Sequence, residues 1–169
     1  MNIQDTLSST EQKVDNSEKI KIYLCGVTVY DESHIGHART IIVFDVLRKY
    51  LENKKKEVEL IQNFTDVDDK IINRANDEGI PAHEISKRYI ENYFRDFDEL
   101  NIKRATNYPK ATEHIEDIIE FIKKLIEKGI AYASENGVYF SVSKFPEYGK
   151  LSKKKIDELK SGSRIQVDE

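Results

Sequence analysis

The sequence predicts an α/β fold with parallel strands, and the order of its first elements carries this prediction. A β-branched and aromatic run at 20–24 is followed by apolar residues at helical spacing over 38–51 and by a short strand at 58–61. A strand, a helix and a strand in this order form a βαβ unit, whose loops open at the C-terminal ends of its strands. The loops at 25–37 and 63–70 should therefore meet at one edge of a sheet.

Composition sets the limits of the interpretation. The chain has 169 residues, enough for one domain or a domain with a small insertion, and is 38% hydrophobic and 34% charged, as in globular proteins. With a formal net charge of -4, this chain is not expected to supply most of the phosphate contacts if RNA is a partner. The single cysteine excludes an internal disulfide framework and favours a reducing cytoplasm. We see no signal peptide and no run near the roughly 18–20 apolar residues of a membrane span, so no membrane association is expected.

The segments outside the βαβ unit are predicted from their own patterns. Residues 1–19 are polar and should form a poorly ordered lead-in. Helices are expected over 69–78 and 82–100, and Gly79 lies where the first of them should end.

The C-terminal third contains the strongest helical pattern of the chain. Apolar residues recur at helical spacing over 111–128, and Gly129 suits the C-terminal cap. Asn136-Gly137 is a hairpin turn signal with a short strand on each side. The charged tail contains a helix-like stretch at 153–159.

The segment His34-Ile35-Gly36-His37 lies between a predicted strand and a predicted helix. Histidines three residues apart at a helix start share one side of its first turn, and Gly36 lets a flat ring or a phosphate approach the backbone. The helix N-terminus adds free N–H groups and a field that favours anions. These features predict a polyphosphate site whose imidazoles stabilise charge during phosphoryl or nucleotidyl transfer. The alternative for these residues alone is that the histidines cap or pack at the turn.

Two further features have a structural and a functional interpretation. Asp66, Asp68 and Asp69 suggest either a divalent metal site or, as we favour, the cap and first-turn charges of the following helix. Cys25 ends the first strand, where a lone cysteine is usually a small buried hydrophobe.

The residues around both loops closely resemble the signature segments of cysteinyl-tRNA synthetases. The resemblance is carried by CGVTVYDESHIGHART at 25–40 and NFTDVDDKII at 63–72, and it continues in shorter matches to Ser161-Gly-Ser-Arg164. It implies the first half of a Rossmann-like (HUP-type) class I synthetase catalytic domain at 20–100, followed by the start of its connective insertion at 101–169.

This resemblance implies that cysteine is activated with ATP and Mg²⁺ and transferred to tRNA(Cys). His34 and His37 match the HIGH motif, which contacts the phosphates of ATP during adenylate formation. Tyr30 and Gly36 lie in the same ATP-binding segment.

The same resemblance implies a pocket for the amino acid. Gly26, Thr28 and Thr65 match residues that line it, and a bulky side chain at position 26 would block the substrate. Cys25 matches the first of four zinc ligands. Zinc in this family binds the thiolate of the substrate, which discriminates against the weaker hydroxyl ligand of serine.

The family pattern is only partly present. Met1 is the only methionine, so the second signature, KMSKS, is missing, and a single cysteine excludes a complete zinc ligand set. We therefore expect a part of a longer or two-part enzyme, completed in the second case by a complementary C-terminal chain, and little activity from this chain alone. The alternatives are a non-catalytic nucleotide- or partner-binding fragment and a cysteine ligase of the mycothiol type, which shares the fold, zinc and HIGH.

Overall fold

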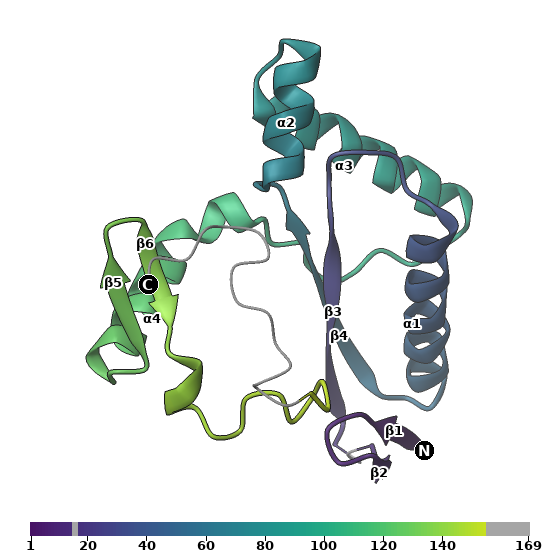
Figure 1. Cartoon of the computed structure of the whole chain (residues 1–169). Coiled ribbons are helices and arrows are strands. Elements are labelled where there is room, and N and C mark those ends of the chain that lie inside the picture. Colours follow the sequence, from purple (N-terminus) through teal and green to yellow (C-terminus); the bar gives the residue numbers. More distant parts are fainter. Residues whose placement is uncertain (15–16, 155–169) are drawn as a thin grey trace. The chain divides into compact units, whose positions relative to one another are not determined.

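The computed structural model describes residues 1–14 and 17–154, which fall into two compact units (Figure 1). The larger unit, Asp15–Ile115, contains the βαβ elements. The second unit combines Met1–Val14 with Glu116–Glu169. The division between a catalytic domain at 20–100 and a connective insertion at 101–169 stays a prediction. The segment after residue 100 belongs to the larger unit because it pairs with a strand there.

The predicted βαβ arrangement is confirmed. Strands β3 (Lys19–Thr28) and β4 (Glu57–Thr65) run parallel and are connected by helix α1 (Ile35–Asn53) (Figure 1). Strand β3 extends to Thr28, into the predicted loop at 25–37. This extension pairs with β4 after a shift in register between Leu24 and Val27, which marks a bulge.

A third segment runs parallel to the other edge of β4. Gln62 N–H donates to the Asn107 carbonyl at 3.1 Å, and Phe64 N–H donates to that of Pro109 at 2.9 Å. The resulting order, with β4 in the middle, is that of the first three strands of a doubly wound sheet. Within the described part of the chain, β3 is paired on one edge only.

The core of the larger unit joins its strands to helices α2 (Asp69–Glu78) and α3 (Ala82–Glu99). Phe64 of β4 is 1% exposed, and Ile71 of α2 and Ile85 of α3 are fully buried. The Phe64 ring meets those of Tyr93 at 5.0 Å and Tyr108 at 5.2 Å. Each such side chain contributes roughly 1.5–3 kcal/mol through burial, so α2 and α3 are held firmly at the C-terminal end of the strands.

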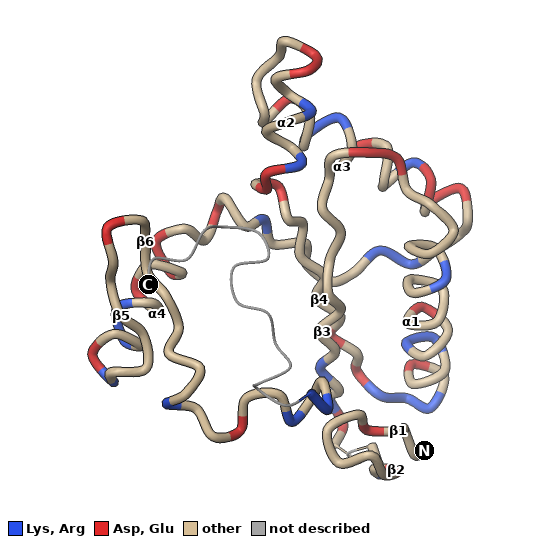
Figure 2. Tube along the Cα trace, viewed as in Figure 1, with Lys and Arg blue, Asp and Glu red and all other residues tan. Residues whose placement is uncertain are grey.

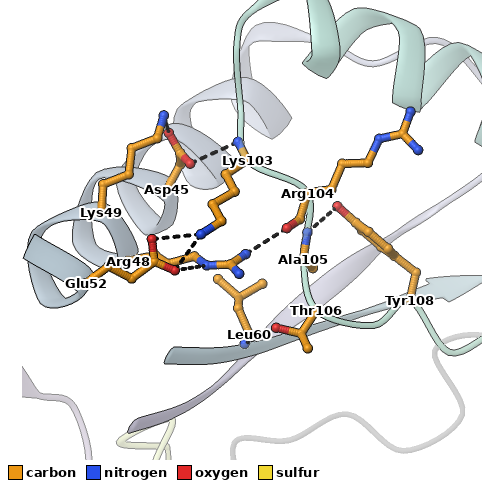
Figure 3. A network of polar contacts seen from close by, with 10 residues as sticks. All are labelled: Asp45, Arg48, Lys49, Glu52, Leu60, Lys103, Arg104, Ala105, Thr106 and Tyr108. Atoms are coloured by element: carbon orange, nitrogen blue, oxygen red, sulfur yellow. Dashed lines mark hydrogen bonds and ion pairs between the residues drawn. The ribbon is translucent and has the colours of Figure 1, made fainter. Parts of the chain in front are cut away.

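A polar network fastens the second half of α1 to the chain after α3 (Figure 3). Asp45 and Arg48 are both 7% exposed. The Asp45 carboxylate accepts the backbone N–H of Lys103 at 3.1 Å, and the Arg48 guanidinium donates to the Arg104 carbonyl at 2.7 Å. Glu52 completes the network by accepting from Arg48 and from the Lys103 ammonium. Because these buried charges are paired, the network fixes how the chain returns to β4.

The second unit contains two hairpins and a helix. Strands β5 (Ala131–Ser134) and β6 (Gly137–Phe140) form the predicted hairpin. Strands β1 (Asn2–Asp5) and β2 (Thr10–Lys13) form another within the predicted poorly ordered lead-in. The Asp5 carboxylate closes the turn between β1 and β2 by accepting the N–H groups of Leu7 and Ser8.

The helix predicted over 111–128 is divided in the structure. It consists of the 3₁₀ helix η1 (Ala111–His114) and α4 (Ile115–Glu127), and a short 3₁₀ helix η2 (Val142–Lys144) follows the hairpin. The predicted helix-like stretch at 153–159 lies almost wholly outside the described residues. None of the described helices is both long and apolar enough to cross a membrane.

Candidate functional site

A cavity of about 330 Å³ lies where β3 ends and α1 and α2 begin. Its lining includes five residues that the sequence predicts for ATP or amino-acid binding: Gly26, Thr28, Tyr30, His34 and His37. The remaining lining residues are Val27, Asp31, Glu32 and Lys70. The first loop and the start of α2 therefore meet at one edge of the sheet, as parallel strand ends require.

Three other predicted site residues lie outside the lining of this cavity. Thr65 pairs with Thr28 across the two strands, and its hydroxyl accepts from the Asn63 side chain at 3.3 Å. Cys25 is exposed, with its sulfur 3.8 Å from the Gly26 carbonyl. Gly36 lies within the first turn of α1.

The two histidines cap the helix that they begin. His34 is the N-cap residue, and its Nδ1 accepts the N–H of Gly36 at 3.1 Å. Nδ1 of His37 accepts the N–H of His34 at 3.4 Å, which completes a capping box. The two rings stack with centroids 3.8 Å apart and planes inclined by 16°. The structural interpretation of the histidines is therefore correct, and it is compatible with a chemical role.

The caps determine which ring nitrogens are free. A neutral imidazole has one donor and one acceptor nitrogen, so an accepting Nδ1 places the proton on Nε2 in both rings. Burial lowers the pKa of His37, and the neighbouring His34 lowers that pKa further. Near neutral pH the pair therefore presents Nε2–H donors without a full charge on His37.

Gly36 lies close against the ring of the residue that caps the helix. A Cβ built on Gly36 would lie 2.9 Å from Cε1 and 3.0 Å from Nδ1 of His34. The space beside this glycine, which the sequence suggests is kept for a ligand, is therefore used by the His34 ring.

Gly26 is required by the neighbouring strand. A Cβ at this position would lie 1.5 Å from the backbone oxygen of Asn63 and 2.5 Å from its carbonyl carbon. Its N–H donates to Oδ1 of Asn63 at 2.9 Å. The same oxygen accepts the Tyr23 hydroxyl at 2.8 Å. Asn63 thus connects the bulge of β3 to Thr65, a role that its place within the second signature segment does not reveal.

The aspartates after β4 have structural contacts in the described chain. Asp68 is the N-cap of α2 and accepts the N–H of Lys70 at 2.9 Å, as we favoured from the sequence. Asp66 accepts the N–H and the hydroxyl of Thr112 at 3.0 and 2.5 Å. It thereby holds η1 against the end of β4.

The residues present do not fit a complete zinc site. Zinc is held by three or four nitrogen, sulfur or carboxylate ligands. The described residues contain no group of three or more histidine, cysteine, aspartate or glutamate side chains placed to share a metal ion. Cys25 would supply one ligand, and the others would have to come from residues outside the described part of the chain.

Comparison with known proteins gives a single family. Residues 11–169 match the family described as tRNA synthetases class I (C) catalytic domain. The chain is 58% identical to a cysteine–tRNA ligase of Thermodesulfovibrio yellowstonii, and 53% identical to those of Caldicellulosiruptor saccharolyticus and Carboxydothermus hydrogenoformans. Each match covers 100% of this chain and 36–37% of the relative, so the chain spans little more than a third of their length.

Solved structures support the fold. A Mycobacterium tuberculosis methionyl-tRNA synthetase in complex with methionyl-adenylate superimposes with a TM-score of 0.59 and 21% identity. The match covers 66% of this chain and 23% of that enzyme. A second structure of the same enzyme, bound by methionyl-adenylate, gives a TM-score of 0.59 at 20% identity over 67% of this chain and 23% of that one. This likeness confirms the predicted partial Rossmann-like architecture.

Proposed function

Because this chain belongs to the family of class I (C) tRNA synthetase catalytic domains, we propose that it builds the first half of a site that activates cysteine with ATP. The product would be passed to tRNA(Cys), as the name of its relatives implies. The complete enzyme is then this chain together with the remainder, on the same chain or on a complementary one. One observation carries the proposal, namely the cavity that gathers Gly26, Thr28, Tyr30, His34 and His37.

The proposed reaction uses groups that the cavity offers. A carboxylate oxygen of cysteine attacks the α-phosphorus of Mg²⁺-ATP, the bond to the β-phosphate breaks, and pyrophosphate leaves. Negative charge grows on the phosphate oxygens during this step. The Nε2–H donors of His34 and His37, fixed by the helix cap, are suited to stabilise that charge. Thr28 and Thr65, paired across the strands, would supply hydroxyls to the amino acid.

The proposal is tested by pyrophosphate exchange. The complete enzyme should exchange labelled pyrophosphate into ATP when cysteine is present and should do so poorly with serine. The purified chain alone should not reach a normal rate, because it carries only part of the site. Exchange that depends on another amino acid would contradict the proposal. Full activity of the chain alone would contradict the proposal that the chain carries only part of the site. Transfer of cysteine to an amino sugar rather than to tRNA would identify the mycothiol type of ligase.

Cys25 is proposed as one ligand of a zinc site completed outside the described residues. It is exposed, and no second cysteine exists in the chain. The complete enzyme should retain stoichiometric zinc through dialysis, as measured by metal analysis, and Cys25→Ser should lose most of it. The chain alone should retain none, because a single thiolate cannot hold the ion. Unchanged zinc content in Cys25→Ser would remove Cys25 from the ligand set.

Among the described residues, one edge of β3 is unpaired, and this edge supports the proposal of a complementary part. Glu57 N–H donates to the Glu18 carbonyl at 2.8 Å, so alternation along β3 directs the peptide groups of Lys21 and Tyr23 away from β4. A parallel strand of the remainder can pair there, beside the strand that ends at the cavity.

Binding of tRNA is proposed to depend mainly on the remainder. Figure 2 shows acidic and basic residues interleaved along α1 and α3, so neither helix carries an uninterrupted run of basic residues. The reaction proposed for this enzyme belongs to translation and hence to the cytoplasm.

A further inference from the structure

Lys70 belongs to the second signature segment rather than to the histidine motif, yet it lines the same cavity as His34 and His37. It is the second residue of α2, the helix that follows β4. Its ammonium lies 4.9 Å from the centre of the Tyr30 ring, within the range of a cation–π contact. The start of α2 thus brings a cation to the loop that follows β3.

No carboxylate of the described chain forms an ion pair with Lys70. The arginines of α2 and α3 are engaged. Arg74 and Arg88 bind Glu78, and Arg95 binds Asp96 and lies 3.9 Å from Glu32. Of the acidic residues in the cavity lining, Glu32 accepts from the Asn92 side chain at 2.7 Å, and Asp31 accepts the Glu32 N–H at 2.9 Å. An ammonium that contacts an aromatic ring has no carboxylate to balance its charge, so it can still form an ion pair with an incoming anion.

The other polar groups of the cavity do not supply a permanent positive charge. Lys70 is the only lysine or arginine among the described residues of its lining. His37 favours the neutral form because burial lowers its pKa. A nucleoside triphosphate would therefore meet imidazole and backbone donors in this cavity, and Lys70 would be the one permanently charged cation among the described lining residues.

Local physics does not explain a lysine at this position. The first turn of a helix favours acidic residues, because its N-terminus carries partial positive charge. A lysine that opposes this preference and contacts an aromatic ring rather than a carboxylate is often placed for a ligand.

We propose that Lys70 is a further substrate-binding residue, whose ammonium pairs with the phosphate chain of ATP in the cavity that also holds His34 and His37. This inference rests on the proposed function and extends it to α2, which the HIGH motif does not include. Tyr30 acts as the positioning residue, because its ring holds the ammonium at the cavity.

The test compares Lys70→Met, Lys70→Arg and the matched control Lys87→Met in the complete enzyme. Lys87 lies exposed on α3, outside the cavity lining. Titration calorimetry should show that Lys70→Met binds ATP about 10- to 100-fold more weakly, the loss expected for one charge-assisted hydrogen bond. Affinity for adenosine, which has no phosphates, should stay within about twofold. Lys70→Arg should recover most of the ATP affinity, and Lys87→Met should match the unmodified enzyme.

The possible outcomes separate the inference from the proposed function. Unchanged ATP affinity in Lys70→Met overturns the inference, and so does an equal loss for ATP and adenosine, which would indicate a structural role. A rise in KM for cysteine with an unchanged KM for ATP would reassign the ammonium to the amino-acid carboxylate and also overturn it. Lys70-dependent ATP binding without cysteine-dependent exchange would leave the inference standing and reject the proposed function. Cysteine-dependent exchange together with unchanged ATP affinity in Lys70→Met would support the proposed function and reject the inference. The melting temperature of Lys70→Met should change little, because this exposed lysine loses one cation–π contact and no ion pair of the described chain.

Discussion

Gly26→Ala should destabilise the larger unit by at least about 3 kcal/mol, the upper range for forcing an atom into a packed interior. The added methyl carbon would lie 1.5 Å from the Asn63 carbonyl oxygen, which belongs to the backbone of β4 and cannot rotate away. The strands would have to separate at the bulge, where Gly26 N–H also binds Asn63. Chemical denaturation of the purified chain, followed by circular dichroism, measures the change in free energy of unfolding.

Gly79→Ala is the matched control for this substitution. Gly79 ends α2 with a φ of 68°, and a Cβ there would meet no atom within 4 Å. Its replacement should cost only the strain of a left-handed alanine, about 1–2 kcal/mol. If Gly26→Ala destabilises the chain no more than Gly79→Ala does, the close approach of β3 to β4 is not the reason for glycine at position 26.

His37→Ala in the complete enzyme should lower the rate of adenylate formation by about 100- to 1000-fold, the usual loss of one preorganised donor at a charged transition state. Binding of cysteine should change by much less, because the proposed function assigns the lost Nε2–H to phosphate charge. Pyrophosphate exchange measures the first effect, and equilibrium binding of cysteine measures the second.

The comparison needs a control because His37 also accepts the His34 N–H. Loss of this cap would weaken the start of α1 by about 1 kcal/mol and would affect both measurements alike. His83→Ala, on the exposed surface of α3, should leave both unchanged. An equal loss of adenylate formation and cysteine binding in His37→Ala would assign the residue to structure alone.

The elements of the larger unit were predictable because each depends on its own pattern. The alternation in β3, the helical spacing in α1 and the glycine that ends α2 are all local features. The extension of β3 and the pairing of β4 with the segment after α3 were not predictable. The first depends on the approach of Gly26 to Asn63, and the second on hydrogen bonds from β4 to residues 107–109, more than 40 positions away.

The candidate site also combines features that were predictable from the sequence with features that were not. The histidines stand out because they flank a glycine at a helix start, and the structure adds that they cap the helix through Nδ1. The role proposed for Lys70 was missed because the three aspartates before it draw attention to capping. Its signal was present nonetheless, since a lysine immediately after the start of a helix opposes the dipole.

The one-sided pairing of β3 also bears on how a chain of the relatives' length is made. The residues clustered around Phe64 all lie between Leu24 and Tyr108, so this core can assemble while later residues are still in the ribosome. During that interval β3 exposes unpaired backbone N–H and C=O groups, and a strand of another nascent chain can pair with them. Rapid arrival of the next strand, or shielding by a chaperone, would then decide between productive folding and aggregation.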